Sequence, residues 1–212
     1  MVSGEPIESP AKARARESGP SPSSFAAANV TAILRARGWL TSPRSPAAIA
    51  LRPPERPEGV GEDGARDPEL DAWLADAAAL LGPHAADREA LAELLALIFH
   101  YDARAILQSP ESHAVLTREG AREVIRELAH LVLEGPEIDS DRFKEIVTAL
   151  KGRLRVRGRE LFHPIRLALA GRAAEGALDR VVLLLDRAAR LPFRVRVKSA
   201  RQRILEFCAA ME

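Results

Sequence analysis

The chain has 212 residues, enough for one large or two small domains. Its apolar share of 47%, with 29% charged residues, is typical of a globular protein, and its longest apolar run, around Leu94–Phe99, is too short to span a bilayer. One cysteine, Cys208, excludes an internal disulfide and predicts a cytoplasmic protein. Alanine and leucine dominate, which favours helices over strands.

Charge divides the chain into two unequal parts. Residues 151–212 hold 15 Lys and Arg against 6 Asp and Glu, a net charge of +9, whereas residues 1–150 hold 16 against 24, a net charge of −8. A basic C-terminal third indicates a polyanionic partner such as a nucleic acid. A solvated, arginine-rich helical surface is the alternative that charge alone leaves open.

Residues 1–66 are predicted to be a disordered extension and linker, because they are rich in Pro, Ser and Gly. A helix candidate lies within them at 29–40. It is either a remnant of a preceding domain or, as we favour, a short helix that docks Ile33, Leu34 and Trp39 on the core. The folded domain is predicted to cover residues 67–212.

Apolar residues at helical spacing predict a series of helices in the first part of this domain. The predicted ranges are 67–82, 87–100, a short turn at 102–107, 117–135, and a helix from Asp139 or Ser140 through Leu150. Asp67-Pro68 starts the first one as an N-cap followed by proline at the first helical position. Asp102 is expected to be a cap or turn residue, and Thr117 is expected to cap the third long helix.

Two further helices are predicted near the C-terminus, over 178–185 and from Lys198 or Ser199 onward. Between them, residues 193–197 alternate apolar and cationic side chains, the pattern of a short strand, although residues 154–157 offer only a weak partner. The predicted fold class is therefore all-α, a bundle of short helices.

The functional interpretation depends on residues 151–171. The first part of this segment carries five cations, loosened by two glycines: Lys151, Arg153, Arg155, Arg157 and Arg159. The second part turns apolar, and Pro164 is expected to be the first residue of a helix that ends at Gly171 in the left-handed conformation.

The stretch Gly158-Arg-Glu-Leu-Phe-His-Pro-Ile-Arg-Leu-Ala-Leu-Ala-Gly171 closely resembles a segment in the C-terminal, anticodon-binding region of bacterial glutamyl-tRNA synthetases. The pattern of that family reads roughly Gly-Lys/Arg-x-Leu-Phe/Met-x-Pro-Leu/Ile-Arg-x-Ala-Leu-Thr-Gly. The resemblance is strong over 143–171, moderate over 91–142, weak after 171 and absent before about 67.

This resemblance implies a helical anticodon-binding fold and a tRNA partner, in the first place glutamate tRNA. Arg166 matches the family's arginine at the anticodon and is expected to stack on an RNA base or bond its edge; the alternative is an ion pair with a helix carboxylate such as Glu160. The phosphate contacts are expected from Lys151, Arg153, Arg155, Arg157 and Arg159. His163 is either a loop histidine or a base-stacking one, and Phe162 is expected to plug the core.

Catalysis by this chain alone is not expected. It contains neither the His-x-Gly-His-type motif nor the Lys-x-Ser-Lys-type loop of the family's catalytic domain, and no Gly-rich phosphate loop. We therefore assign no catalytic residues and no cofactor, and we consider a separately encoded catalytic chain as a possible partner. No metal is assigned either, because the other histidines lack metal-ligand spacing: His84, His100, His113 and His130.

Two departures from the family pattern keep another function open. Ala170 stands where the family has threonine, and residues 174–177 replace its usual Gly-Pro-Glu region. The alternative is a protein-interaction or structural domain that kept the fold but lost RNA binding. A truncated or split synthetase product is the third possibility.

Overall fold

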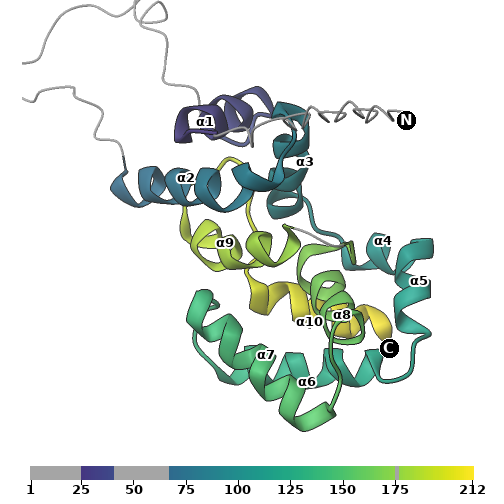
Figure 1. Ribbon diagram of the computed structural model, residues 1–212. Coiled ribbons are helices and arrows are strands. Elements are labelled where there is room, and N and C mark those ends of the chain that lie inside the picture. Colours follow the sequence, from purple (N-terminus) through teal and green to yellow (C-terminus); the bar gives the residue numbers. More distant parts are fainter. Residues whose placement is uncertain (1–24, 41–66, 175–176) are drawn as a thin grey trace, which may run out of the picture.

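The computed structural model describes residues 25–40, 67–174 and 177–212, and these residues form an all-α structure (Figure 1). The elements in chain order are α1 (Ala27–Ala36), α2 (Pro68–Leu81), the 3-10 turn η2 (Gly82–His84), α3 (Arg88–Phe99), α4 (Ala103–Leu107), α5 (Pro110–Leu116), α6 (Ala121–Glu134), α7 (Ser140–Leu154), α8 (Arg159–Ala170), α9 (Leu178–Arg190) and α10 (Ala200–Met211). The predicted fold class is confirmed. The disorder expected for residues 1–24 and the linker expected over 41–66 lie outside the described residues.

Most helices begin where a short polar side chain caps them. Asp67 accepts a hydrogen bond from the backbone N–H of Glu69, and Pro68 follows as the first residue of α2. Asp87, Asp102, Asp139 and Ser199 cap α3, α4, α7 and α10 in the same way. Each cap satisfies backbone N–H groups that have no partner inside the helix, which is why these starting points were predictable from sequence.

The start of α6 was predicted wrongly. Ser109 caps an additional helix, α5, with Pro110 in its first turn, and Thr117 ends that helix by donating its hydroxyl to the carbonyl of His113. The next helix, α6, begins only after Gly120, whose φ of 77° is accessible to glycine without strain. Proline at a helix start is favourable, so Pro110 opens a helix that we had not predicted.

The position of Pro164 was also predicted wrongly. Helix α8 begins at Arg159, after Gly158, so Pro164 lies inside the helix rather than at its first position. The proline removes one N–H from the ladder and leaves the carbonyl of Glu160 without its usual partner. Glu160 is exposed, so water can reach the backbone there. Gly171 ends α8 with a φ of 80°, as expected.

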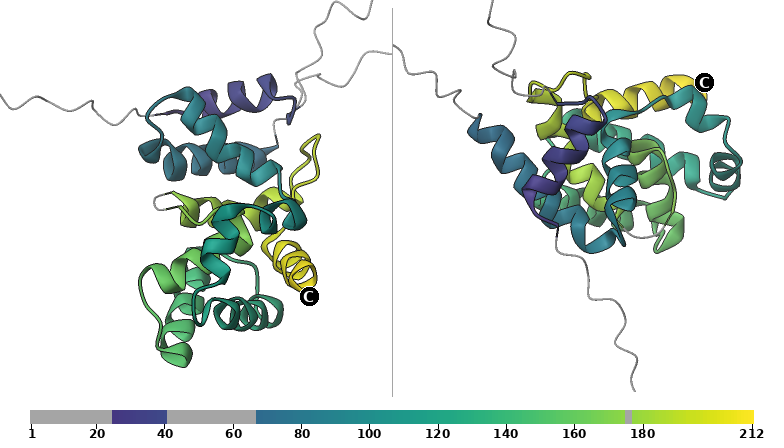
Figure 2. Two further views of the ribbon diagram at one scale, coloured as in Figure 1. Left: turned by 90° about the vertical axis from the view of Figure 1, so that its right-hand side faces the viewer. Right: turned by 90° about the horizontal axis from the view of Figure 1, so that it is seen from above.

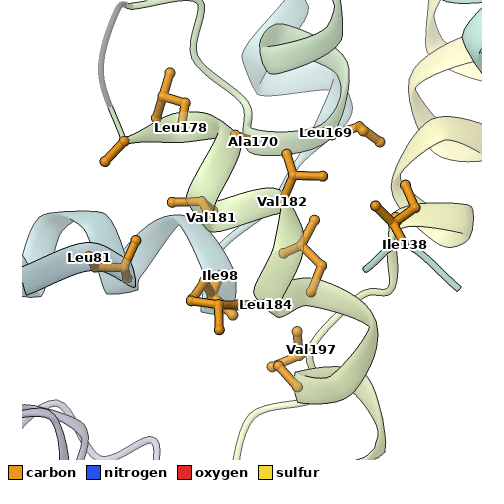
Figure 3. Close-up of a cluster of buried hydrophobic side chains, with 14 of the residues drawn as sticks. Leu81, Ile98, Ile138, Leu169, Ala170, Leu178, Val181, Val182, Leu184 and Val197 are labelled. Carbon is orange, nitrogen blue, oxygen red and sulfur yellow. The ribbon is translucent and has the colours of Figure 1, made fainter. Parts of the chain in front are cut away.

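Helix α9 is the centre of the bundle. It contacts α2 and α3 on one side and α8 and α10 on the other, while α6 and α7 form the opposite end of the molecule from α1 (Figures 1 and 2). Figure 3 shows Val181, Val182 and Leu184 of α9 among side chains from α2, α3 and α8. All three are at most 1% exposed, because the apolar run that predicted this helix is wider than one face and needs neighbours around it.

The first helix packs on the body through an aromatic cluster. Trp39 stacks on Phe99 with 4.5 Å between ring centroids, and Trp73 and Phe193 meet Phe99 edge-on. Ile33 and Leu34 are buried as well, so the docking of α1 favoured from sequence is confirmed. Residues 193–197 form no strand: Phe193 joins this cluster, and Arg194 donates its backbone N–H to the carbonyl of Trp39.

A buried arginine, Arg203, joins the ends of several helices. It is fully buried, and its guanidinium donates to the carbonyls of Leu97, Ile98, Leu169 and Lys198. The carbonyls at the ends of α3 and α8 carry the negative ends of the helix dipoles, which partly replaces a carboxylate partner. Burial still lowers the pKa of Arg203 to about 10.

A buried carboxylate, Asp186, accepts hydrogen bonds from backbone N–H groups near two other helices. Its two oxygens accept from the backbone N–H of Ile138 and of Ala200, each at 2.7 Å. One bond fixes the chain before α7 and the other fixes the first turn of α10, and both are anchored to the central helix α9.

Candidate nucleic-acid interface

The five cations expected to bind phosphates stand on three successive pieces of backbone. Lys151 and Arg153 occupy the last turn of α7, Arg155 and Arg157 lie in the connection, and Arg159 is the first residue of α8. All five are exposed. Lys151 and Arg153 also face the negative end of the α7 dipole, which stabilises that helix.

The connection between α7 and α8 has a defined shape. Arg155 adopts a left-handed conformation with a φ of 54°, and Gly158 follows with a φ of 55°. Val156 reaches the start of α6, where its methyl carbon lies 3.9 Å from the place that a side-chain Cβ at Gly120 would occupy. Arg153 forms an ion pair with Glu127 of α6. The cations therefore project from a turn held against α6 and not from a loose segment.

The exposed side of α8 carries Arg159, Phe162, His163 and Arg166. Their spacing of three and four residues places them on neighbouring turns of one helix face. Phe162 packs against the core yet stays partly exposed, so the expectation of a buried plug is only half met. Its ring is flanked by two cations, with Lys151 Nζ at 5.7 Å and Arg166 Cζ at 5.3 Å from the centroid.

Arg166 is held by a carboxylate of the next helix. Its Nε and one terminal nitrogen donate to the two oxygens of Asp179 in α9, both at 2.8 Å, and the other terminal nitrogen donates to the carbonyl of Ala174 at 3.3 Å. The side chain is 12% exposed. The ion pair that sequence allowed does exist, but its partner is Asp179 rather than Glu160.

His163 meets an arginine that sequence reasoning did not select. A guanidinium nitrogen of Arg118, in the turn between α5 and α6, lies 3.2 Å from Nδ1 of His163. Arg118 is exposed. The two residues are 45 positions apart, so no local pattern in the sequence connects them. The contact brings a further cation to the exposed face of α8.

A comparison with known protein families finds a match that includes the cationic turn between α7 and α8. The family model described as "Anticodon binding domain" matches residues 44–191, which is more than half of the chain. The chain belongs to the anticodon binding domain family.

A relative of this anticodon binding domain agrees with the resemblance found from Gly158–Gly171. The protein named "Glutamate--tRNA ligase 2" of Syntrophus aciditrophicus (strain SB) is 35% identical to the chain over 75 residues. That match covers 35% of this chain and 15% of the relative, so the chain corresponds to a small part of that ligase. No solved structure matches the chain. The predicted glutamyl-tRNA synthetase-type anticodon-binding region is confirmed.

The first departure from the family pattern lies away from the surface of this anticodon binding domain. Ala170 is 1% exposed, so replacing the family's threonine changes the interior and removes no hydroxyl from the proposed RNA face. Just before the second departure, Glu111 of α5 accepts the backbone N–H of Ala173 at 2.8 Å.

We also looked for metal sites, membrane-spanning helices and a reactive cysteine in the described part of this anticodon binding domain. Within residues 25–40, 67–174 and 177–212, no three His, Cys, Asp or Glu side chains are grouped so as to hold a metal ion. In the same ranges no helix combines the length and apolar character needed to cross a membrane. Cys208 is half-buried on α10, and burial raises the pKa of its thiol, which keeps it protonated at neutral pH.

Proposed function

We propose that this chain is a non-catalytic tRNA-binding module that holds the anticodon arm of a tRNA. The observation that carries the proposal is the exposed cationic turn between α7 and α8, set beside the exposed face of α8 in an anticodon binding domain. The division into an extension over 1–66 and a binding domain over 67–212 remains part of this proposal, with α1 packed on that domain.

The five cations of the turn supply affinity rather than sequence choice. Lys151, Arg153, Arg155, Arg157 and Arg159 are exposed, so a phosphate can reach each of them. Arg153 is already paired with Glu127, so its phosphate contact exchanges one anion for another. Binding should weaken steeply as salt rises.

Arg166 and His163 supply the contacts nearest to the bases in this proposal. Asp179 fixes the guanidinium of Arg166 beside Phe162. Arg118 lies beside His163. A guanidinium fixed by a protein carboxylate loses less conformational freedom when RNA binds than a free one does. Arg166 thus enters the complex already oriented.

The finer assignments rest on the similarity to the glutamate ligase. We propose glutamate tRNA as the partner, a cytoplasmic location, and support in trans of glutamyl-tRNA aminoacylation by a separately encoded catalytic chain. The chain itself is proposed to have no catalytic role.

The test is binding of the purified chain to glutamate tRNA over a salt series, with a second tRNA as competitor. If all five cations neutralise phosphates, the logarithm of the association constant should fall against the logarithm of salt with a slope of about −4. Selective, salt-sensitive binding supports the full proposal. Salt-sensitive binding without selectivity supports the basic surface but not the glutamate tRNA, and no binding at physiological salt refutes the proposal.

A protein-interaction or structural domain is the second candidate. The observation that favours it is the closed ion pair of Arg166 with Asp179, since the residue expected to read RNA already has a partner. This candidate would be supported if a protein partner co-purified with the chain and the ultraviolet absorbance ratio of the sample were that of protein without nucleic acid. The third, a split or truncated synthetase product, is tested by searching the neighbouring reading frame for the catalytic motifs.

A further inference from the structure

The exposed side of α8 combines one aromatic ring with cations from three different elements. Lys151 comes from α7, Arg166 from α8 itself, and Arg118 from the turn before α6. Sequence reasoning assigned the ring of this set, Phe162, to the core and did not select Arg118. Their arrangement in space gives both a different role.

Phe162 lies at the edge of the core and not inside it. The neighbouring positions Leu161 and Ile165 are both 0% exposed and fill the inner face of α8, and every residue from Leu167 to Ala170 is buried too. Phe162 instead keeps part of its ring at the surface. A partly exposed ring can meet a partner at the surface, which a fully buried ring cannot.

The two cations beside the ring point to the chemistry of the occupant. An aromatic ring next to Lys or Arg is the combination with which proteins hold single-stranded nucleic acid, because the base stacks on the ring while the cations meet the phosphates. In the anticodon arm of a tRNA, the unpaired loop bases are the ones available for such stacking.

We propose that Phe162 is a stacking platform for one unpaired RNA base and that Arg118 binds a phosphate beside it. The proposal rests on the tRNA binding proposed above and adds the residue on which a base lies. Arg166, fixed by Asp179, stays beside the ring, while the exposed Lys151 leaves it and turns to a phosphate when the base arrives.

The stacking step is tested with the full chain and two short single-stranded RNA oligonucleotides, one normal and one abasic at every position. Phe162→Leu, which keeps an apolar side chain but removes the ring, should weaken binding of the normal oligonucleotide about fivefold to a hundredfold. Binding of the abasic oligonucleotide should not change. Phe162→Tyr should retain the wild-type preference for the normal one.

Phe143→Leu is the matched control for a general packing effect. Phe143 is also half-buried, but it lies in the first turn of α7, at the other end of that helix from Lys151. It should leave both oligonucleotides unaffected. An equal loss on normal and abasic RNA for Phe162→Leu, or no loss on either, would overturn the stacking proposal.

Arg118→Gln tests the phosphate contact separately. It should lower the affinity for both oligonucleotides alike and reduce the salt slope by about one. Arg35→Gln, on the exposed side of α1 at the opposite end of the molecule, is the control and should change neither (Figure 1). An unchanged salt slope in Arg118→Gln would overturn its assignment.

The design separates failure of this inference from failure of the proposed function. If the wild-type chain binds neither oligonucleotide nor tRNA, the RNA-binding function itself is wrong and the platform falls with it. If the wild-type chain binds and Phe162→Leu binds equally well, only the platform is wrong. As an independent readout, Phe162→Trp should show fluorescence quenching by the normal oligonucleotide and none by the abasic one.

Discussion

Arg166 and Asp179 face each other through two parallel contacts of 2.8 Å, and this ion pair joins α8 to the first turn of α9. The pair is mostly sheltered, with side chains 12% and 25% exposed. Asp179 also lies where the α9 dipole favours a negative charge. The pair therefore serves the fold, whatever it does for RNA.

Removing either partner should destabilise the chain. Arg166→Gln or Asp179→Asn should each lower the free energy of unfolding by about 1–3 kcal/mol, because the remaining charge is left partly buried without its partner. The double variant should lose less than the sum of the two single losses. Urea unfolding followed by tryptophan fluorescence measures all three, since Trp39 and Trp73 are both buried.

The same two variants separate an RNA contact from a purely structural one. If Arg166 contacts RNA, Arg166→Gln should weaken tRNA binding about tenfold, whereas Asp179→Asn keeps the cation and loses only its fixed orientation, so it should weaken binding less. Equal affinities for both variants, measured well below their unfolding transitions, would remove Arg166 from the interface. Arg172→Gln, at an exposed position in the loop after α8, is a suitable control for the loss of one charge.

Arg203 is the residue on which we expect the fold to depend most. Arg203→Met keeps the length and apolar stem of the side chain but removes the donor to four carbonyls, two of them in buried hydrogen bonds, so it should cost about 3–5 kcal/mol. Arg203→Lys should recover part of that loss, because one ammonium cannot reach all four. Cooperative unfolding of Arg203→Met at the wild-type urea midpoint would contradict this assignment.

The one tyrosine of the chain, Tyr101, should titrate abnormally. Its hydroxyl donates to the carbonyl of Ala168 at 2.5 Å, and burial raises its pKa well above the ordinary value of 10. The unfolded chain therefore loses this proton near pH 10 while the folded chain keeps it, so the contribution to stability is complete below pH 10 and declines above it. Phenolate absorbance should appear only when the protein unfolds in alkali.

A comparison with Tyr101→Phe isolates this effect. The lowered pKa of Arg203 changes the stability in the opposite direction. Above about pH 10 the folded chain loses the Arg203 proton while the unfolded chain keeps it, so stability from this group rises with pH. The pH profile of the wild-type chain therefore combines both groups. The difference between wild-type and Tyr101→Phe unfolding free energies should be about 1 kcal/mol at neutral pH and should shrink above pH 10. Phenolate absorbance in a chain that is still folded at pH 10 would contradict the prediction.

The parts of the fold that sequence predicted correctly depend on local chemistry. A capping carboxylate such as Asp67 or Asp139 bonds N–H groups two or three residues away, so its effect is written in adjacent positions. The same holds for Gly171, whose left-handed conformation ends α8. The error at Thr117 arose because a threonine can cap the start of a helix or, as here, bond back to a carbonyl at the end of one.

The parts that sequence did not predict depend on contacts between distant positions. Arg203 meets Leu97 across 106 residues, and Arg118 meets His163 across 45. No periodicity links such pairs, and a lone arginine in a helix reads as solvated until its neighbours are known. For the same reason the five cations of residues 151–159 were found at once, whereas the exposure of Phe162 and the partner of Arg166 required the structure.

Arg155 allows a charge to be removed without loss of stability. Its φ of 54° is unfavourable for a side chain with a Cβ, by about 1 kcal/mol or more, and glycine relieves that strain while giving back about as much in unfolded-chain entropy. Arg155→Gly should therefore leave the free energy of unfolding unchanged or raise it by up to about 1 kcal/mol, whereas Arg155→Ala keeps the strain and gains nothing.

Both variants should weaken tRNA binding equally and reduce the salt slope by about one, since both remove the same cation. If the alanine variant is more stable than the glycine variant, the turn does not hold Arg155 in the left-handed conformation. If neither variant changes the salt slope, Arg155 does not meet a phosphate.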